Sequence, residues 1–307
     1  MKICCDRARH LLWHGLCAVL LYATCVATVM AAPFELPPLV TPASAEHHVG
    51  KVIWVELVTP DLVGSKAFYS GLFGWTFQDL HGDKTDYTVA FLDGRPVAGL
   101  FHKAVAPTEH RQPSWLTFIA VRDVDAAKAS ALAHGAKVVF EPRSFPQRGR
   151  QAVFADPDGA VFAVLASSSG DPADVLAAPG EWIWSSLHTT NPDTDAAFYQ
   201  ALLGYDVFDV PTEDGSEHNI LSSEDYARAS VNHFPSNSSH RHPHWLNYVR
   251  VVDAAAVAAK AVALGGRVLV EPHLDRHGGN VAVIADPTGA PFGLMEWSGT
   301  DIRKEPK

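Results

Sequence analysis

The feature that most constrains the fold of this chain is an internal repeat with a constant offset of 130 residues. Short groups of residues recur at that offset, among them Ile53-Trp54 as Ile183-Trp184, Phe68-Tyr69 as Phe198-Tyr199, Trp115-Leu116 as Trp245-Leu246, and Asp156-Pro157 as Asp286-Pro287. One register held over so many matches indicates two copies of one structural unit. The halves are predicted at residues 49–168 and 180–298. The stretch 169–179, with its Ser, Gly, Asp and Pro, is predicted as the linker.

Within each half, the pattern of apolar residues and helix caps predicts a strand followed by a helix, twice. Residues 51–59 form an apolar-rich strand, after which Asp61 can cap a helix that Gly74 ends. A second strand at 115–121 leads to an Ala-rich helix capped by Asp123, and short strands follow each helix. Each half therefore reads as two βαβββ modules, which places the chain in the α+β class.

The N-terminus has the pattern of a secretory signal. Lys2, Arg7 and Arg9 precede a short apolar run at 16–30, and small residues follow at a possible cleavage site. We therefore predict a signal peptide at 1–32, a mature N-terminal segment at 33–48, and an exported protein, periplasmic or secreted. The alternatives are an uncleaved membrane anchor and lipidation of Cys25. Residues 299–307 are predicted as a C-terminal tail.

Cysteine usage and charge exclude several functions. All four cysteines lie within the first 25 residues, so the body of the chain has no disulfide and no thiol chemistry. Without residues 1–32 the chain keeps 21 basic and 33 acidic side chains, a formal charge of −12, and it has no basic block. A nucleic acid is therefore not expected as a partner, and a membrane is expected only if the signal is uncleaved.

The helix motif Phe68-Tyr69 with Leu72 to Trp75, together with the Asp-Pro-x-Gly turn at 156–159, resembles the vicinal oxygen chelate superfamily. This superfamily includes lactoylglutathione lyase, bleomycin-resistance proteins and extradiol dioxygenases. The resemblance covers nearly everything after residue 49. It implies that the two modules of each half curl a mixed sheet into a cup that holds the ligand. The reaction does not follow from the fold.

Metal-using members of this superfamily hold a divalent ion on His, Gln and Glu side chains from the first, fourth, fifth and last strands of a cup. Counting along the motifs places no strong ligand at the matching positions, because indole, alanine and glycine offer no lone pair to a metal ion, and the remaining residues offer at most a weak hydroxyl or amide oxygen. We therefore expect both cups to be metal-free and predict no cofactor. The residues at these positions are Trp54, Ala98 or Gly99, Thr117 and Ala163 in the first half, and Trp184, Ala229 or Ser230, Asn247 and Gly293 in the second.

Alternation along a strand suggests which side chains line the cups. Residues two apart share a face, so Trp54 and Glu56 are expected to point into the first cup, and Trp184, Ser186 and His188 into the second. An indole wall with a few polar groups suits a flat or apolar small molecule. The other predicted ligand-binding residues are Trp115, Thr117, Trp245 and Asn247.

Glu56 and His188 are the candidate catalytic residues. A carboxylate on a concave sheet face loses solvation and can act as a general base, but a salt-bridged Glu56 at the rim is an equal alternative. His188 could transfer a proton, or it could be a hydrogen-bonded structural histidine.

Two functional hypotheses follow. The first is metal-independent binding of a small apolar or aromatic molecule by an exported, monomeric protein. The second is a lyase, isomerase or dioxygenase, either metal-dependent through non-standard His ligands or using Glu56 as a general base.

Overall fold

The computed structural model describes residues 35–297 and Gly299, apart from 83–84, 105–112, 211–217, 235–241 and 276–277. The predicted signal peptide and nearly all of the predicted tail lie outside these residues. Within the described part, no helix is long and apolar enough to cross a membrane.

The first half contains two βαβββ modules in sequence. The first module has β1 (Val52–Thr59), α1 (Leu62–Phe73), β2 (Thr76–Gly82), β3 (Thr85–Leu92) and β4 (Arg95–His102). The second has β5 (Ser114–Ala120), α2 (Val124–Ala133), β6 (Lys137–Phe145), β7 (Gly149–Ala155) and β8 (Val161–Ser167).

The second half repeats this order. Its first module has β9 (Trp182–Thr189), α3 (Pro192–Leu203), β10 (Asp206–Asp209), β11 (His218–Ser223) and β12 (Tyr226–His233). Its second module has β13 (His244–Val251), α4 (Ala254–Ala263), β14 (Arg267–Leu274), β15 (Asn280–Ala285) and β16 (Pro291–Glu296).

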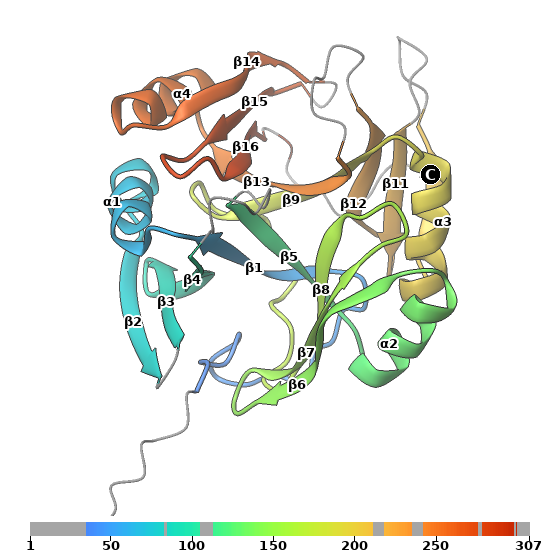
Figure 1. The fold of residues 1–307 in the computed structure, drawn as a ribbon. Coiled ribbons are helices and arrows are strands. Elements are labelled where there is room, and N and C mark those ends of the chain that lie inside the picture. The colour runs from blue at the N-terminus through green and yellow to red at the C-terminus, as the bar shows by residue number, and fades with distance from the viewer. Residues whose placement is uncertain are drawn as a thin grey trace, which may run out of the picture. The chain divides into compact units, whose positions relative to one another are not determined.

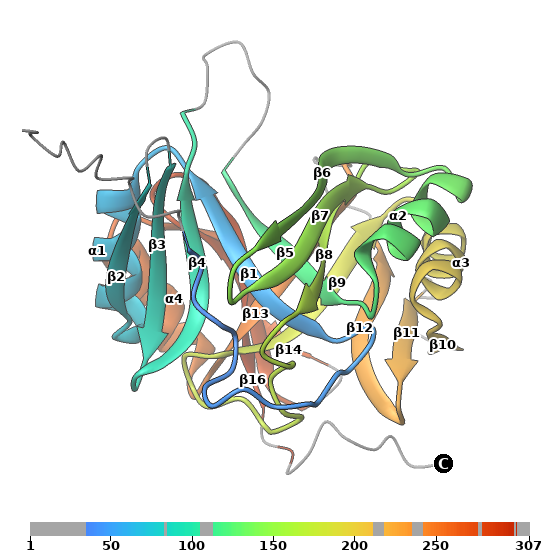
Figure 2. The same ribbon diagram turned by 90° about the horizontal axis from the view of Figure 1, so that it is seen from below.

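Each half forms one mixed sheet of eight strands, in the orders β2-β3-β4-β1-β5-β8-β7-β6 and β10-β11-β12-β9-β13-β16-β15-β14. In the first sheet, β1 pairs with β4 in parallel and with β5 antiparallel, so the first strand of each module lies at the centre. Figure 2 shows the outer strands of this sheet as two wings on either side of β1 and β5. The predicted fold class, two tandem domains of curled mixed sheet, is confirmed.

The helix boundaries follow the predicted caps. The Asp61 side chain accepts a hydrogen bond from the Gly64 amide, and Gly74 ends α1 in the left-handed conformation, with φ of 76°. Asn191 precedes α3 without a side-chain cap bond, and Pro192 stands at the first position of that helix. Strand β2, which the sequence analysis did not identify, pairs antiparallel with β3 at the sheet edge.

The helices pack on the face of each sheet that is turned toward the other half (Figure 1). As a result, each hydrophobic core contains residues of both halves. One core joins the first module of the first half to the second module of the second half, and the other core joins the remaining two modules. The opposite, concave faces form what we call cup 1, in the first half, and cup 2, in the second.

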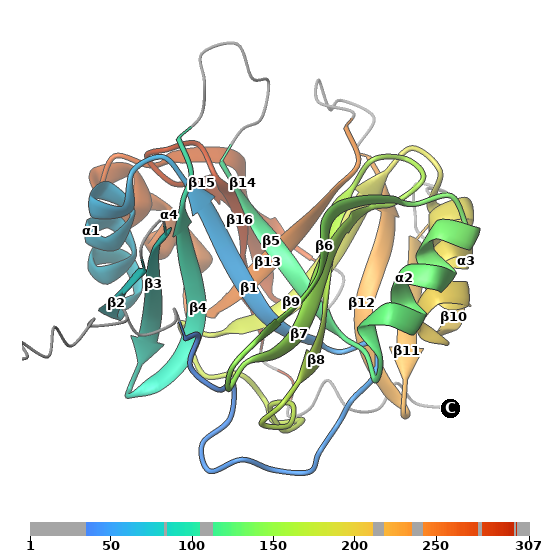
Figure 3. The same cartoon turned by 60° about the horizontal axis from the view of Figure 1, so that its bottom comes forward.

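The described residues that precede β1, from residue 35 on, enter cup 1. Figure 3 shows this segment, in dark blue, beside β4 and then passing around the end of the sheet to β1. Leu36 and Leu39 are only 3% and 7% exposed, and they pack in the cup 1 cluster with Trp54 and Tyr87. The Leu39 amide donates a hydrogen bond of 3.0 Å to the Ser169 hydroxyl, which fixes the segment to the start of the linker.

Candidate functional site

The first strand of each half presents the predicted side chains to its cup. In cup 1, Trp54 clusters with Tyr87 and Phe118, while Val55 and Leu57 belong to the core on the other face. In cup 2, Trp184 packs with Leu246, Tyr248 and Met295. Alternation along β1 and β9 therefore placed Trp54, Glu56, Trp184, Ser186 and His188 on the faces that the sequence analysis expected.

Four other predicted site residues lie on the opposite face and line neither cup. Thr117 and Asn247 are fully buried where the two halves meet, and their side chains are hydrogen-bonded to each other at 3.0 Å. Trp115 and Trp245 lie in the two shared cores, where each indole NH donates to a tyrosine hydroxyl, at 3.0 and 2.9 Å.

The error in these four positions has a simple cause. The prediction placed Thr117 by counting back along the chain from the helix cap Asp123. That count is one residue out of step with the pairing of β5 with β1. Leu116 lies opposite Glu56 in the antiparallel β1–β5 pair, so Leu116, not Thr117, faces cup 1. Leu246, opposite Ser186, takes the same place in cup 2. A shift of one residue moves a side chain to the other face of the sheet.

Glu56 lies at the centre of a polar group in cup 1. Its Oε1 accepts hydrogen bonds from the Tyr87 hydroxyl at 2.7 Å and from the Trp54 indole NH at 3.2 Å. Burial raises the pKa of Glu56, while the Tyr87 hydrogen bond, the charge of Arg148 and the Trp54 hydrogen bond act in the opposite direction. Glu56 is thus a partly buried carboxyl group with hydrogen-bond partners, not a rim residue in a salt bridge.

The N-terminal segment and Arg148 cover this polar group. Arg148 is 1% exposed, its guanidinium lies 4.4 Å above the Trp54 ring, and its Nε donates to the Pro37 carbonyl at 2.9 Å. Together with Leu36 and Leu39, these contacts place protein side chains where a ligand of cup 1 would lie.

Cup 2 presents hydroxyl groups in place of the Glu56 carboxyl group. Ser186 takes the place of Glu56, and its hydroxyl lies 2.8 Å from that of Ser230, which also accepts the Trp184 indole NH at 3.2 Å. A cluster of apolar and aromatic side chains surrounds these groups. Its members are Ile183, Trp184, Leu246, Tyr248, Val281, Val283, Met295 and Trp297.

Three imidazoles lie near one another at the end of cup 2. The His188 ring stacks on His244 at 5.7 Å between ring centres, and Phe234 lies on the same stack at 6.5 Å. Burial lowers the pKa of His188 to about 3, and the nearby His244 and His218 act in the same direction. His188 Nε2 is buried without a hydrogen-bond partner. His188 is therefore neutral near pH 7 and can accept or donate a hydrogen bond.

Of these three histidines, the sequence alone pointed only to His188. The three residues lie on β9, β11 and β13, so only the strand order places them together. In cup 1, Val58 occupies the sheet position that His188 has in cup 2, and Tyr87 occupies the position that His218 has there. The group belongs to cup 2 alone.

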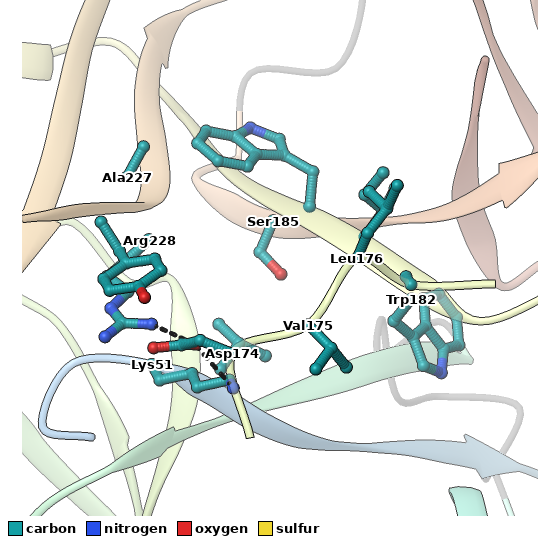
Figure 4. A pocket seen from close by; sticks show the side chains of 13 residues that line it. Lys51, Asp174, Val175, Leu176, Trp182, Ser185, Ala227 and Arg228 are labelled. Carbon is teal, nitrogen blue, oxygen red and sulfur yellow. Dashed lines mark hydrogen bonds and ion pairs between the residues drawn. The ribbon is translucent and has the colours of Figure 1, made fainter. Parts of the chain in front are cut away.

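A cavity of about 130 Å³ opens beside Trp184, between the cup 2 face and the linker. Figure 4 shows Val175 and Leu176 of the linker with Trp182 beside them on one side, and Ala227 and Arg228 on the opposite side. Arg228 lies 4.8 Å above the Tyr226 ring and is bonded to Asp174 at 2.6 Å. The cavity is therefore bordered by aromatic rings and has a paired charged group at one end.

The positions that hold the metal ion in metal-using relatives do not fit an ion in either cup. The cup-facing residues there are Trp54, Gly99, Leu116 and Ala163 in cup 1, and Trp184, Ser230, Leu246 and Gly293 in cup 2. A Cβ added at Gly99 would lie 2.0 Å from the Tyr87 hydroxyl, and one at Gly293 would lie 2.0 Å from the Tyr248 ring. The side chains of Tyr87 and Tyr248 thus already fill the space that a metal-binding side chain would need at Gly99 and Gly293.

Comparisons with known proteins agree with this architecture. A family model described as the glyoxalase/bleomycin resistance protein/dioxygenase superfamily matches residues 48–164, and a glyoxalase-like domain model matches 184–295. The "Putative glyoxylase CFP32" of Mycobacterium bovis is 33% identical over 257 residues, which cover 83% of this chain and 98% of that protein. The "Anthracycline biosynthesis protein DauV" of Streptomyces sp. strain C5 is 33% identical over 259 residues, covering 80% and 93%.

Solved structures show the same fold at low sequence identity. The Mn(II)-bound glyoxalase from Novosphingobium aromaticivorans has a TM-score of 0.57 and 19% identity, over 81% of this chain and 83% of that one. The 2,3-dioxygenase LapB from Pseudomonas sp. KL28 has a TM-score of 0.58 and 14% identity, over 82% and 93%.

Proposed function

Because the chain belongs to the glyoxalase/bleomycin resistance protein/dioxygenase superfamily, we propose that it binds a small apolar or aromatic molecule in cup 2, without a metal ion at the cup floor. The observation that carries this proposal is the cavity beside Trp184, which lies at the mouth of a face rich in aromatic and apolar side chains. Apolar cavities of roughly 150 Å³ accept one benzene molecule, so an aromatic ring is of suitable size.

The difference between the two cups supports the choice of cup 2. Cup 1 contains Leu36 and Leu39 of the chain itself, whereas the segment that precedes the second half borders the cup 2 cavity at Val175 and Leu176. The relatives named for anthracycline biosynthesis also favour an aromatic ligand, because an anthracycline carries fused aromatic rings. Stacking on the Trp184 indole and a hydrogen bond to the Ser185 hydroxyl, both of which line the cavity, would hold such a ring.

Filling the cavity tests the proposal. Indole and 1-naphthol are titrated into the protein by calorimetry, with and without EDTA, and we expect binding under both conditions. Ala227→Phe places a ring in the cavity and should abolish binding, because Ala227 lines it. Val139→Phe adds the same ring at a position 47% exposed on β6 and should leave binding unchanged.

Unchanged affinity in Ala227→Phe would remove this cavity as the site. Loss of binding in EDTA, restored by a metal ion, would contradict metal independence.

A second candidate function is an enzyme, a lyase, isomerase or dioxygenase, that uses Glu56 as a general base. The observation that favours it is the raised pKa of the partly buried Glu56 carboxyl group beside the Tyr87 hydroxyl. Access to Glu56 then requires the N-terminal segment to leave cup 1. Glu56→Gln separates the alternatives, because loss of turnover with intact folding would establish a base, while unchanged behaviour leaves Glu56 structural.

We also propose that the protein is exported and acts as a monomer. Export rests on the basic and apolar pattern of residues 1–32. The monomer rests on the shared cores, because each half already covers the helix-bearing face of the other. Fractionation of cells and light scattering of the purified protein test these two points.

A further inference from the structure

Outside the floors of the cups, charged side chains gather where three segments meet. His48 ends the N-terminal segment, Asp174 belongs to the linker, and Glu224 lies in the turn between β11 and β12. One ligand atom from each of these residues lies within 4.8 Å of the other two. His48 Nδ1 is 2.9 Å from the Glu224 carboxylate and 3.7 Å from Asp174 Oδ2.

Neighbouring cations hold both carboxylates and leave one oxygen of Asp174 unused. Arg228 contacts Glu224 Oε2, the oxygen that faces His48, at 3.0 Å. Lys51 and Arg228 contact Asp174 through its Oδ1, at 2.8 and 2.6 Å. Asp174 Oδ2 is buried and has no hydrogen-bond partner, and neither has His48 Nε2. The second oxygen of Asp174 is thus fixed in place and unused.

The charges around His48 do not balance within the protein. Glu46 lies 3.7 Å from its ring, and Asp171 accepts a hydrogen bond of 2.7 Å from its backbone amide. The Asp171 side chain is 3% exposed, and its Oδ1 is buried without a hydrogen-bond partner. The carboxylates of Glu46, Asp171, Asp174 and Glu224 thus outnumber the permanent cations Lys51 and Arg228, and the neighbouring imidazoles are those of His48 and of His47, 3.9 Å from Asp171. A further cation at the partly buried carboxylates is favoured, because such groups are costly without a partner.

We propose that His48, Asp174 and Glu224 bind one divalent transition-metal ion. One imidazole and two carboxylates suit Zn²⁺ or Mn²⁺, and three protein ligands leave positions for water. Lys51 and Arg228 hold the other oxygen of Asp174 and orient its carboxylate. At an offset of 130, His48 corresponds to Ala178 and Asp174 to Ser44, so the first half offers no equivalent site. The ion joins the N-terminal segment and the linker to the second half, and it lies outside the cup floors.

Calorimetric titration with MnCl₂ and ZnCl₂ tests this site on chelator-treated protein without an affinity tag. We expect saturable binding of one ion per chain. Glu224→Gln and His48→Gln should each weaken binding by at least about tenfold. Glu224 is 42% exposed, so its substitution should not prevent folding. Asp225→Asn, at the next residue of the same turn, and His273→Gln, at an exposed histidine elsewhere, are the matched controls and should bind as the wild type does.

Two results would overturn the proposal. One is the absence of saturable binding at millimolar metal concentrations. The other is the same affinity in the wild type, Glu224→Gln and His48→Gln, which would assign the ion to other histidines. Thermal unfolding of each variant without metal verifies that loss of binding reflects loss of a ligand and not loss of the fold. Neither result depends on whether indole or 1-naphthol binds in cup 2.

Discussion

At the scale of single residues, the side chains that identify the superfamily in the sequence are mostly structural. The Tyr69 hydroxyl accepts the Trp115 indole NH and donates to Asp286 Oδ2 of the other half at 3.2 Å. The Tyr199 hydroxyl does the same with Trp245 and Asp156, at 3.0 Å to the carboxylate. The tyrosine of each helix motif thus meets the Asp-Pro turn of the other half, and the motifs join the halves without contacting a ligand.

Removing one of these hydroxyls is expected to destabilise the whole protein. In Tyr69→Phe, the Trp115 NH and the Asp286 oxygen stay buried without this partner, which should lower the free energy of unfolding by about 1–3 kcal/mol. Tyr199→Phe should cost a similar amount. Urea denaturation measures both, with Tyr226→Phe, a partly exposed tyrosine, as a control expected to change by less than about 0.5 kcal/mol. A change in Tyr69→Phe no larger than in the control would contradict this role.

His188 should make stability depend on pH. Its folded pKa of about 3 lies below the ordinary value of 6.5, so the unfolded chain takes up the proton first as the pH falls. The contribution of neutral His188 to the free energy of unfolding is therefore complete above about pH 6.5 and is lost progressively as the pH falls toward 3. His188→Phe keeps a ring on the stack but has no imidazole to protonate. Between pH 7 and pH 5, its free energy of unfolding, measured by urea denaturation, should therefore fall by less than that of the wild type. The control His273→Phe, at an exposed position, should retain the pH dependence of the wild type. If the free energy of unfolding of His188→Phe depended on pH as strongly as that of the wild type, His188 would not be buried in its neutral form.

At the scale of elements, the segments that precede the two halves make the cups different. The segment before β1 places Leu36 and Leu39 in cup 1, while the linker before β9 runs beside the cavity of cup 2. The two sheets have the same strand order, so the difference between the cups comes from these irregular segments and from the side chains on the sheet faces.

Shortening one leucine tests whether the N-terminal segment is part of the folded core. Leu39→Ala removes apolar atoms that are 7% exposed and should lower the free energy of unfolding by about 2–3 kcal/mol. Leu274→Ala, at a residue 71% exposed on β14, is the matched control and should change it by less than about 0.5 kcal/mol. Chemical denaturation compares the two variants. Equal effects would indicate that the segment is not held in cup 1.

At the scale of the whole molecule, neither half has a complete core of its own. Helix α1 packs with α4 and helix α2 with α3, and both clusters mix residues of the two halves. The chain outside the predicted signal peptide should therefore unfold in one cooperative transition, although the sequence describes two domains.

Expression of residues 33–168 alone tests this interdependence. The fragment exposes the apolar helices and the buried face of β5, so we expect it to pair with a second copy of itself or to aggregate. Light scattering gives its mass, and circular dichroism its cooperativity on heating. A monomeric fragment with a sharp transition would contradict the shared cores, whereas the intact chain should remain monomeric at the same concentration.

The sequence by itself determined the repeat, the two βαβββ modules of each half, the helix caps and the faces of β1 and β9. These features depend on local spacing, on turn residues and on the two-residue period of a strand. The absence of standard metal ligands at the cup positions was also readable from the motifs. The face of β5 and β13 was not, because the register between neighbouring strands decides it, and Thr117 and Asn247 were assigned to the wrong side.

Only the tertiary structure decided which residues from distant segments meet. It brought His188, His218 and His244 together across three strands, packed Leu36 in one cluster with Trp54, and joined His48 to Asp174 and Glu224. Such contacts connect residues tens to more than a hundred positions apart, and no local pattern encodes them. They form because two sheets and two irregular segments pack around cores that neither half can complete alone.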